Sequence, residues 1–206
     1  MGKEKYSVVK IIQKSQKGCT SMKEYTCKKS TCEKYDIRFN RGDWAFITID
    51  ESTGLFQAHS SFGDYNYSWP NHGRESFKHF ILELADDPSY FLGKVSKEDY
   101  FYADETEESW KKKIIEDRRG NGDVDLTQEQ ARELWDIVNE IEFYSAEGCQ
   151  RELYDNKIVW DLYCEPWYYF ETIVGHSPNA RFFAKEVMPM FAEIIKKEIE
   201  KSEVEQ

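Results

Sequence analysis

The feature that most constrains the fold is a run between positions 44 and 69 in which large and small residues alternate. Side chains at every second position share one face of a β-strand, so this period is typical of strands buried on one side. The last segment places three aromatic rings on a single face. The alternating segments are Trp44 to Asp50, Leu55 to His59 and Tyr65 to Trp69.

Turn sequences separate these segments. Asp50 to Gly54 supplies turn residues for a hairpin with a longer loop, and Phe62-Gly63-Asp64 supplies a second turn. A three-stranded antiparallel meander is therefore predicted over residues 44–69. Two earlier segments, Tyr6 to Ile12 and Tyr35 to Phe39, are predicted as further strands.

After residue 73 the apolar period becomes helical. A first helix over residues 75–85 is predicted to end at Asp86-Asp87-Pro88, and a capping box of Thr127 and Gln130 opens another that runs through Ile141. The spacing of apolar residues between Ile158 and Tyr163 fits either a helix or a strand. A further helix is predicted from Glu107 to Arg119 and is expected to end at Gly120-Asn121-Gly122. Glu165-Pro166-Trp167 is typical of the start of a helix. A long helix is predicted from Asn179 or Ala180 to Lys201, with a bend at Pro189.

The expected fold class is α+β, with an N-terminal antiparallel β-sheet packed with a helical C-terminal part. The sheet-rich part is expected over residues 1–95 and the helical part over 96–206, and the sequence leaves open whether the two pack as one domain. Within the first part we distinguish a basic segment (1–41), an aromatic meander (42–70) and the helix at 75–85. The 32 aromatic residues exclude disorder of the whole chain, because disordered chains lack such groups.

The net charge of −11 combines two opposite parts. Residues 1–41 carry a net charge of +7, and residues 42–206 carry −18. Part of the acidic charge has lysines at the favourable helical i,i+4 spacing, in the pairs Glu107 with Lys111, Glu108 with Lys112, and Glu193 with Lys197. The acidic residues without such an obvious lysine are the candidates for a partner-binding surface: Asp86, Asp87, Glu98, Asp99, Asp123, Asp125, Glu129 and Glu133.

Trp69 and His72 lie in the most distinctive stretch of the chain, residues 61–73. The aromatic residues of this stretch are expected in the core of the sheet. The functional alternative is that Trp69 and His72 lie at its edge and anchor a partner. A stacking platform for single-stranded nucleic acid also requires basic residues, and only Arg74 and Lys78 are near in sequence, unless the basic N-terminal segment folds alongside.

The five cysteines are Cys19, Cys27, Cys32, Cys149 and Cys164. An odd number in a chain without a secretion signal favours reduced thiols in a cytoplasm. The first three are too widely spaced for a typical zinc knuckle, and only His59 or His72 would supply a further ligand through the fold. No cofactor or metal is therefore expected, and ordinary cysteines are the favoured interpretation.

No catalytic motif survives comparison with known patterns. Asn121 to Asp125 resembles the start of a calcium loop, but Leu126 and Arg132 occupy the positions that require glycine and glutamate. Cys149 and Cys164 with His176, or Ser60 and Ser61 with His59, are nucleophile and base combinations without a local signature. No apolar stretch approaches the roughly 20 residues that cross a bilayer, so we expect a soluble, cytoplasmic protein.

One part of the chain resembles small accessory proteins of bacteriophages and prophages. The resemblance covers residues 42–95 and is carried by Gly42-Asp43-Trp44-Ala45, Thr53-Gly54, Ser60 to Tyr65, Tyr67-Ser68-Trp69, Phe80, Asp87 and Tyr90 to Lys94. Accessory proteins of this kind without enzyme motifs are often inhibitors of host machines, anti-CRISPR proteins among them.

The leading hypothesis is a non-enzymatic inhibitor that binds a host protein or nucleoprotein complex with a basic surface through an acidic face. Two alternatives stay open. One is a small metal-dependent or nucleophilic enzyme. The other is a nucleic-acid-binding module that uses the lysines of the N-terminal segment, namely Lys3, Lys5, Lys10, Lys14, Lys17, Lys23, Lys28 and Lys29.

Overall fold

A computed structural model describes residues 29–204 of the chain. It confirms the α+β class, with an N-terminal antiparallel sheet followed by helices. The strand predicted over Tyr6 to Ile12 lies outside the described residues. The chain divides into two compact units, and the boundary falls between Phe80 and Ile81.

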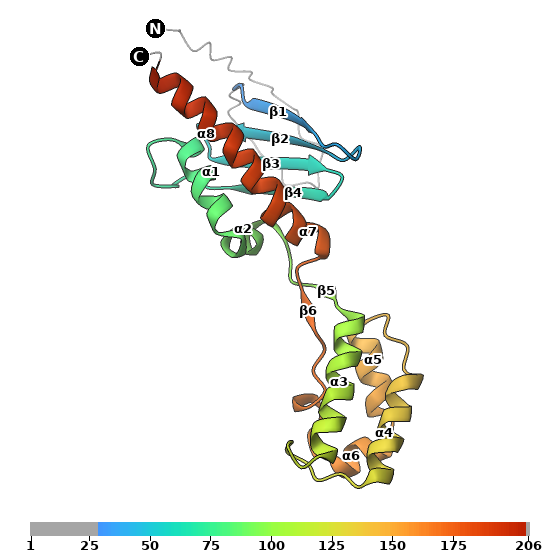
Figure 1. Cartoon of the computed structure of the whole chain (residues 1–206). Coiled ribbons are helices and arrows are strands. Elements are labelled where there is room, and N and C mark those ends of the chain that lie inside the picture. The colour runs from blue at the N-terminus through green and yellow to red at the C-terminus, as the bar shows by residue number, and fades with distance from the viewer. Residues whose placement is uncertain (1–28, 205–206) are drawn as a thin grey trace, which may run out of the picture. The chain divides into compact units, whose positions relative to one another are not determined.

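The first unit contains a four-stranded antiparallel sheet in the order β1-β2-β3-β4 (Figure 1). The predicted meander is confirmed, and the strand predicted from Tyr35 joins it as β1, beginning two residues earlier. The strands are β1 (Glu33–Arg38), β2 (Trp44–Asp50), β3 (Leu55–Ser60) and β4 (Gly63–Ser68).

The two faces of this sheet differ as the alternation predicts. The inner face carries fully buried residues such as Ala45, Ile47 and Phe56. Phe77, the first residue of helix α1 (Phe77–Asp86), is also fully buried, and its ring lies 6.3 Å from that of Trp69. Burying a ring of this size contributes about 1.5–3 kcal/mol, so the inner face supplies the core of the unit.

The turn between β2 and β3 depends on Gly54, whose φ of +62° favours glycine. A side chain at this position would place its Cβ 2.2 Å from the carbonyl oxygen of Trp69. The backbone N–H of Trp69 donates to the Gly54 carbonyl at 2.8 Å. This contact fixes the chain where it leaves β4.

The second unit is mainly helical (Figure 1). A short antiparallel pair, β5 (Tyr100–Phe101) with β6 (Val174–Gly175), joins segments far apart in the sequence and was not predicted. The remaining elements are α2 (Pro88–Val95), α3 (Ala103–Arg118), α4 (Gln128–Glu140), α5 (Ala146–Tyr154), α6 (Lys157–Leu162), the 3₁₀ turn η1 (Pro166–Tyr168), α7 (Pro178–Phe182), the π-helical turn η2 (Phe183–Val187) and α8 (Met188–Val204).

The helices α3 to α6 share one hydrophobic core, to which Trp110, Leu134 and Leu153 contribute fully buried side chains. Helix α3 begins at Ala103, four residues before the predicted start. The open assignment of residues 158–163 resolves as helix α6. The capping box of Thr127 and Gln130 is confirmed at the start of α4.

A π-helical turn, η2, lies directly before the position of the predicted bend at Pro189. The N–H of Met188 donates to the carbonyl of Phe183, five residues earlier, at the end of η2. Proline has no N–H and its ring crowds the carbonyl four residues before it, so the local change of helical period accommodates Pro189. Within residues 29–204, no helix is long and apolar enough to cross a membrane.

Candidate functional site

The acidic candidates are all exposed, but they lie on different elements. Asp87 caps helix α2 by accepting the N–H of Tyr90 at 2.9 Å. Glu98 lies in the loop before β5, and its carboxylate is 3.2 Å from Nε2 of the mostly buried His176. Asp86 and Asp99 occupy the end of α1 and the loop before β5. Asp86 and Asp87 thus lie where α1 meets α2, and Glu98 and Asp99 lie in the loop before β5, so none of the four belongs to α4.

Glu129 and Glu133 are two members of a longer acidic row on α4. Asp136 and Glu140 continue it, at spacings of four, three and four residues. At 3.6 residues per turn, these four side chains fall within an arc of about 60°. We call them the α4 acidic stripe. The sequence contains the signal that identifies Asp136 and Glu140, namely the continuation of the helical spacing beyond Glu133.

The α4 acidic stripe is exposed and unneutralised. All four side chains are exposed, and none forms an ion pair or hydrogen bond with any of residues 29–204. The row spans about 16 Å at 1.5 Å per residue. It is therefore a free linear array of four negative charges.

Helix α3 differs, because lysines pair with three of its acidic residues, Glu107, Glu116 and Asp117. Lys111 lies 2.5 Å from Glu107, as predicted. The predicted pairing of Glu108 with Lys112 is wrong, since Lys112 lies 3.8 Å from Glu116 instead. The pair predicted between Glu193 and Lys197 does not form among the described residues.

A buried network holds the loop that leads into α4. Asp117 is 1% exposed, and its carboxylate accepts from Lys113 at 2.8 Å and from the Tyr163 hydroxyl at 2.7 Å. Burial favours the neutral form of Lys113, but hydrogen bonds to Asp117 and Asp123 outweigh it and raise the lysine pKa. Burial, together with the bond to Asp117, also raises the pKa of Tyr163.

This network contacts residues 121–125, whose sequence resembles the start of a calcium loop. Asp123 forms an ion pair with Lys113 at 2.9 Å, while Asp125 is exposed. Among residues 29–204, no group of three or more His, Cys, Asp or Glu side chains is arranged to hold a metal ion. Asp123 therefore anchors the loop to α3, and Asp125 stands just before the α4 acidic stripe.

An arginine groove runs beside the α4 acidic stripe, shares Asp136 with it, and was not predicted. It has a volume of about 360 Å³ and an apolar floor that includes Ile114 and Ala131. Three guanidinium groups and the Trp135 indole line it. The three arginines are Arg118, Arg119 and Arg132, and their side chains have no ion-pair partner within residues 29–204. This groove depends on α3 packing against α4, which the sequence does not show.

Trp69 is a core residue and does not present its ring as an anchor. It is 6% exposed, and its ring lies 4.7 Å from that of Tyr67 and 5.8 Å from that of Phe80. His72 is half-buried against Phe77, at 5.6 Å between rings. The burial of Trp69 agrees with the expected core position and contradicts the alternative of an anchor at the sheet edge, because the start of α1 covers it.

Other aromatic residues are exposed instead. Trp160, Trp167 and Tyr168 are 43%, 43% and 66% exposed. The rings of Trp160 and Trp167 lie 5.8 Å apart, and those of Trp167 and Tyr168 lie 6.0 Å apart. Exposed tryptophan and tyrosine side chains are typical anchors of protein interfaces. The spacing of apolar residues at positions 158–163 fits both a helix and a strand, so the sequence did not predict that these aromatic side chains are exposed.

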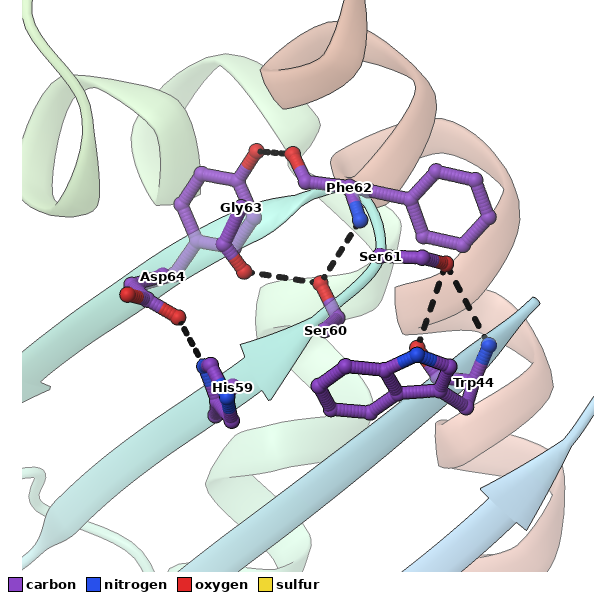
Figure 2. Close-up of polar contacts among 8 residues, drawn as sticks. Trp44, His59, Ser60, Ser61, Phe62, Gly63 and Asp64 are labelled. Atoms are coloured by element: carbon purple, nitrogen blue, oxygen red, sulfur yellow. Dashed lines mark hydrogen bonds and ion pairs between the residues drawn. The ribbon is translucent and has the colours of Figure 1, made fainter.

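The serine and histidine combination does not form a catalytic arrangement. Figure 2 shows Ser60 directed at Gly63, whose carbonyl accepts its hydroxyl proton at 2.8 Å. Ser61 accepts the N–H of Trp44 at 3.2 Å, and His59 pairs with Asp64 through its Nδ1 atom. Neighbouring residues of a strand point to opposite faces, so Ser60 and His59 are separated by the sheet itself.

The cysteine and histidine combination is not assembled either. The thiol of Cys149 donates to the Ala146 carbonyl at 3.3 Å, and burial raises its pKa to about 11. Such a thiol is a poor nucleophile near neutral pH. Cys164 is exposed, and His176 contacts Glu98. Of the proposed zinc ligands, Cys32 is exposed, whereas Cys19 and Cys27 lie outside the described residues.

Comparison with known proteins identifies one relationship. A protein-family model described as a phage family matches residues 25–197, which is most of the chain. No curated protein and no solved structure matches.

Proposed function

The chain belongs to this family of phage proteins, and we propose that it is a non-enzymatic inhibitor of a host nucleic-acid-processing defence complex. It acts in the bacterial cytoplasm by placing an acidic surface on the basic surface with which the complex holds nucleic acid. CRISPR–Cas complexes are one class of such machines, and anti-CRISPR activity is the most specific form of this proposal.

The observation that carries the proposal is the α4 acidic stripe. Its members, Glu129, Glu133, Asp136 and Glu140, are exposed and form no ion pair with the described residues. Residues three or four apart on a helix are about 5–6 Å from each other, which is close to the spacing of successive backbone phosphates. A groove that binds a nucleic-acid backbone therefore offers cations at suitable intervals.

The arginine groove restricts the orientation of such a partner. Arg118, Arg119 and Arg132 line the groove between α3 and α4, which reaches the stripe at Asp136, and they repel a basic surface that approaches over the groove. The partner must therefore meet the helix along the α4 acidic stripe. Repulsive elements of this kind contribute to specificity as much as attractive ones.

Aromatic side chains of the same unit supply the apolar part of the interface. Trp160 and Trp167 are each 43% exposed and lie beside each other. Charged pairs at an interface increase the association rate and select the partner, whereas buried aromatic anchors contribute more of the affinity. The partner is thus expected to combine a basic surface with an apolar pocket.

The test is capture of host proteins on the immobilised chain, followed by competition with nucleic acid. Wild type is expected to retain a nucleic-acid-binding protein that elutes as salt rises, because exposed charge pairs are screened. The purified partner is expected to lose nucleic-acid binding when the chain is added. A partner without nucleic-acid-binding activity, or binding that salt does not weaken, would contradict the proposal.

Two variants with equal charge change separate the stripe from general acidity. The stripe variant carries Glu129→Gln, Glu133→Gln, Asp136→Asn and Glu140→Gln. The control neutralises four exposed acids that also lack partners within residues 29–204, by Glu108→Gln, Glu193→Gln, Glu200→Gln and Glu203→Gln. Loss of inhibition in the stripe variant alone is the expected result, and equal losses in both would exclude a specific site.

A further inference from the structure

The outer face of the sheet gathers aromatic and basic side chains that the sequence does not bring together. Trp44 and Phe46 project from β2, and their rings lie 5.0 Å apart. His59 of β3 stands directly opposite Phe46 in the strand register, and its ring lies 4.9 Å from that of Trp44. Figure 2 shows Trp44 and His59 on neighbouring strands. Three flat rings therefore form a continuous group on one side of the sheet.

Strand β1 supplies the positive charge beside these rings. The Nζ atom of Lys34 lies 4.7 Å from the centre of the Phe46 ring, and the Arg38 guanidinium lies 4.9 Å from it. Both cations are exposed. The register pairs Arg38 with Trp44 and Lys34 with Thr48, so both lie on the outer face.

Three acidic residues also lie on this face, and each contacts a neighbouring side chain; Asp50 of β2 accepts from the Ser52 hydroxyl at 2.7 Å. Asp36 forms an ion pair with Arg38 at 2.6 Å, and Asp64 pairs with His59. Lys34 is left without a carboxylate partner within residues 29–204.

Amide side chains complete the surface beside the rings. Gln57 of β3 pairs in register with Thr48 on one side and with Asn66 of β4 on the other. Gln57 and Asn66 are exposed, and their amides form no hydrogen bond with the described residues. Free amide groups beside a stacking surface can donate to and accept from the edges of bases.

We propose that this outer face binds single-stranded nucleic acid, with bases stacked on Trp44 and His59 and phosphates near Lys34 and Arg38, whose cations lie over the Phe46 ring. Four strands about 4.8 Å apart provide room for two or three bases, and sheets that bind single strands stack the bases on aromatic rings. On this face the His59 ring is exposed, and the Trp44 and Phe46 rings are half-buried. A duplex keeps its bases stacked within itself, so it cannot use these rings. The site is separate from the α4 acidic stripe and does not depend on the function proposed above.

The test is fluorescence anisotropy of the full chain with a labelled oligothymidylate of about 12 nucleotides, at low salt. Wild type is expected to bind the single strand more tightly than a duplex of the same length. Trp44→Leu removes the stacking ring while keeping an apolar side chain, and it is expected to weaken binding about tenfold. Phe182→Leu, at an exposed aromatic residue of the other unit, is the matched control and is expected to bind as wild type.

A second variant tests the phosphate contact, because it perturbs no aromatic ring. Lys34→Gln is expected to reduce the slope of log K against log salt by about 0.7, the value for one phosphate contact with a single strand. Lys97→Gln, at an exposed lysine in the other unit, is expected to leave the slope unchanged. Thermal melting of each variant verifies that the fold is intact.

Three outcomes would overturn the proposal. They are the absence of wild-type binding at low salt, equal affinity for duplex and single strand, and unchanged affinity in a folded Trp44→Leu protein. The stripe variant of α4 is expected to bind the oligothymidylate at least as tightly as wild type. Failure of this site and failure of the inhibitor function are therefore distinguishable.

Discussion

Replacing Tyr163 with phenylalanine tests whether the buried network around Asp117 stabilises the helices that carry the α4 acidic stripe. The Tyr163 hydroxyl donates to Oδ2 of Asp117 at 2.7 Å, and the two residues are 46 positions apart. Both are 1% exposed. The change removes one oxygen and leaves the ring, so it opens no cavity of consequence.

The expected loss is about 2 kcal/mol of unfolding free energy. A hydrogen bond to a charged group is worth about 1.5–3 kcal/mol, and the buried carboxylate loses the one donor that reaches its Oδ2 atom within residues 29–204. Lys113 still contacts Oδ1 at 2.8 Å, which keeps the loss below that of breaking the whole network. Urea unfolding, monitored by circular dichroism, measures this loss. The midpoint urea concentration is expected to fall, while the slope of unfolding free energy against urea concentration stays the same.

The same variant makes a prediction about pH. Burial and Asp117 raise the pKa of Tyr163 in the folded state, so above about pH 10 the unfolded tyrosine ionises while the folded one keeps its proton. The folded state then binds more protons, and the stability of wild type falls as pH rises. The difference in unfolding free energy between wild type and Tyr163→Phe is therefore expected to become smaller above about pH 10. Equal stability at neutral pH, or a constant difference at all pH values, would refute this reasoning.

Three further changes test neighbouring parts of the account. Gly122→Ala places a Cβ 1.8 Å from Oδ1 of Asp117, so its thermal midpoint is expected to fall, and a midpoint like that of wild type would show that the loop rearranges freely. Thr127→Ala removes the α4 cap and is expected to cost about 1 kcal/mol in urea unfolding, and no loss would mean that the cap is replaced. Cys149, whose pKa burial raises to about 11, is expected to react with maleimide far more slowly at neutral pH than the exposed Cys164, as peptide mass spectrometry measures, and equal rates would contradict its burial.

Local sequence signals predicted the parts of the fold that depend on neighbouring residues. The alternation from Trp44 to Trp69 gave the meander, and the capping box at Thr127 gave the start of α4. Glu129 and Glu133 were also predicted as surface acids, because no lysine follows either at helical spacing. These features depend on residues that are close in sequence, either alternating along a strand or lying within one turn of a helix.

Other features depend on contacts between distant segments. The register of β1 against β2 places Lys34 and Arg38 beside Phe46, and a shift of one residue would turn them to the other face. The arginine groove requires α3 to pack on α4, and the exposure of Trp160 requires α6 to be a helix. Trp69 is buried because the start of α1 covers it. None of these contacts has a local signature in the sequence.

The most direct test of the central claim is the salt dependence of partner binding by the wild type and the stripe variant. The purified partner is titrated with each protein at several salt concentrations. Wild-type affinity is expected to fall steeply with salt, while the stripe variant binds weakly and shows a much smaller slope because its four carboxylates are absent. Equal slopes for the two proteins would contradict docking through the α4 acidic stripe.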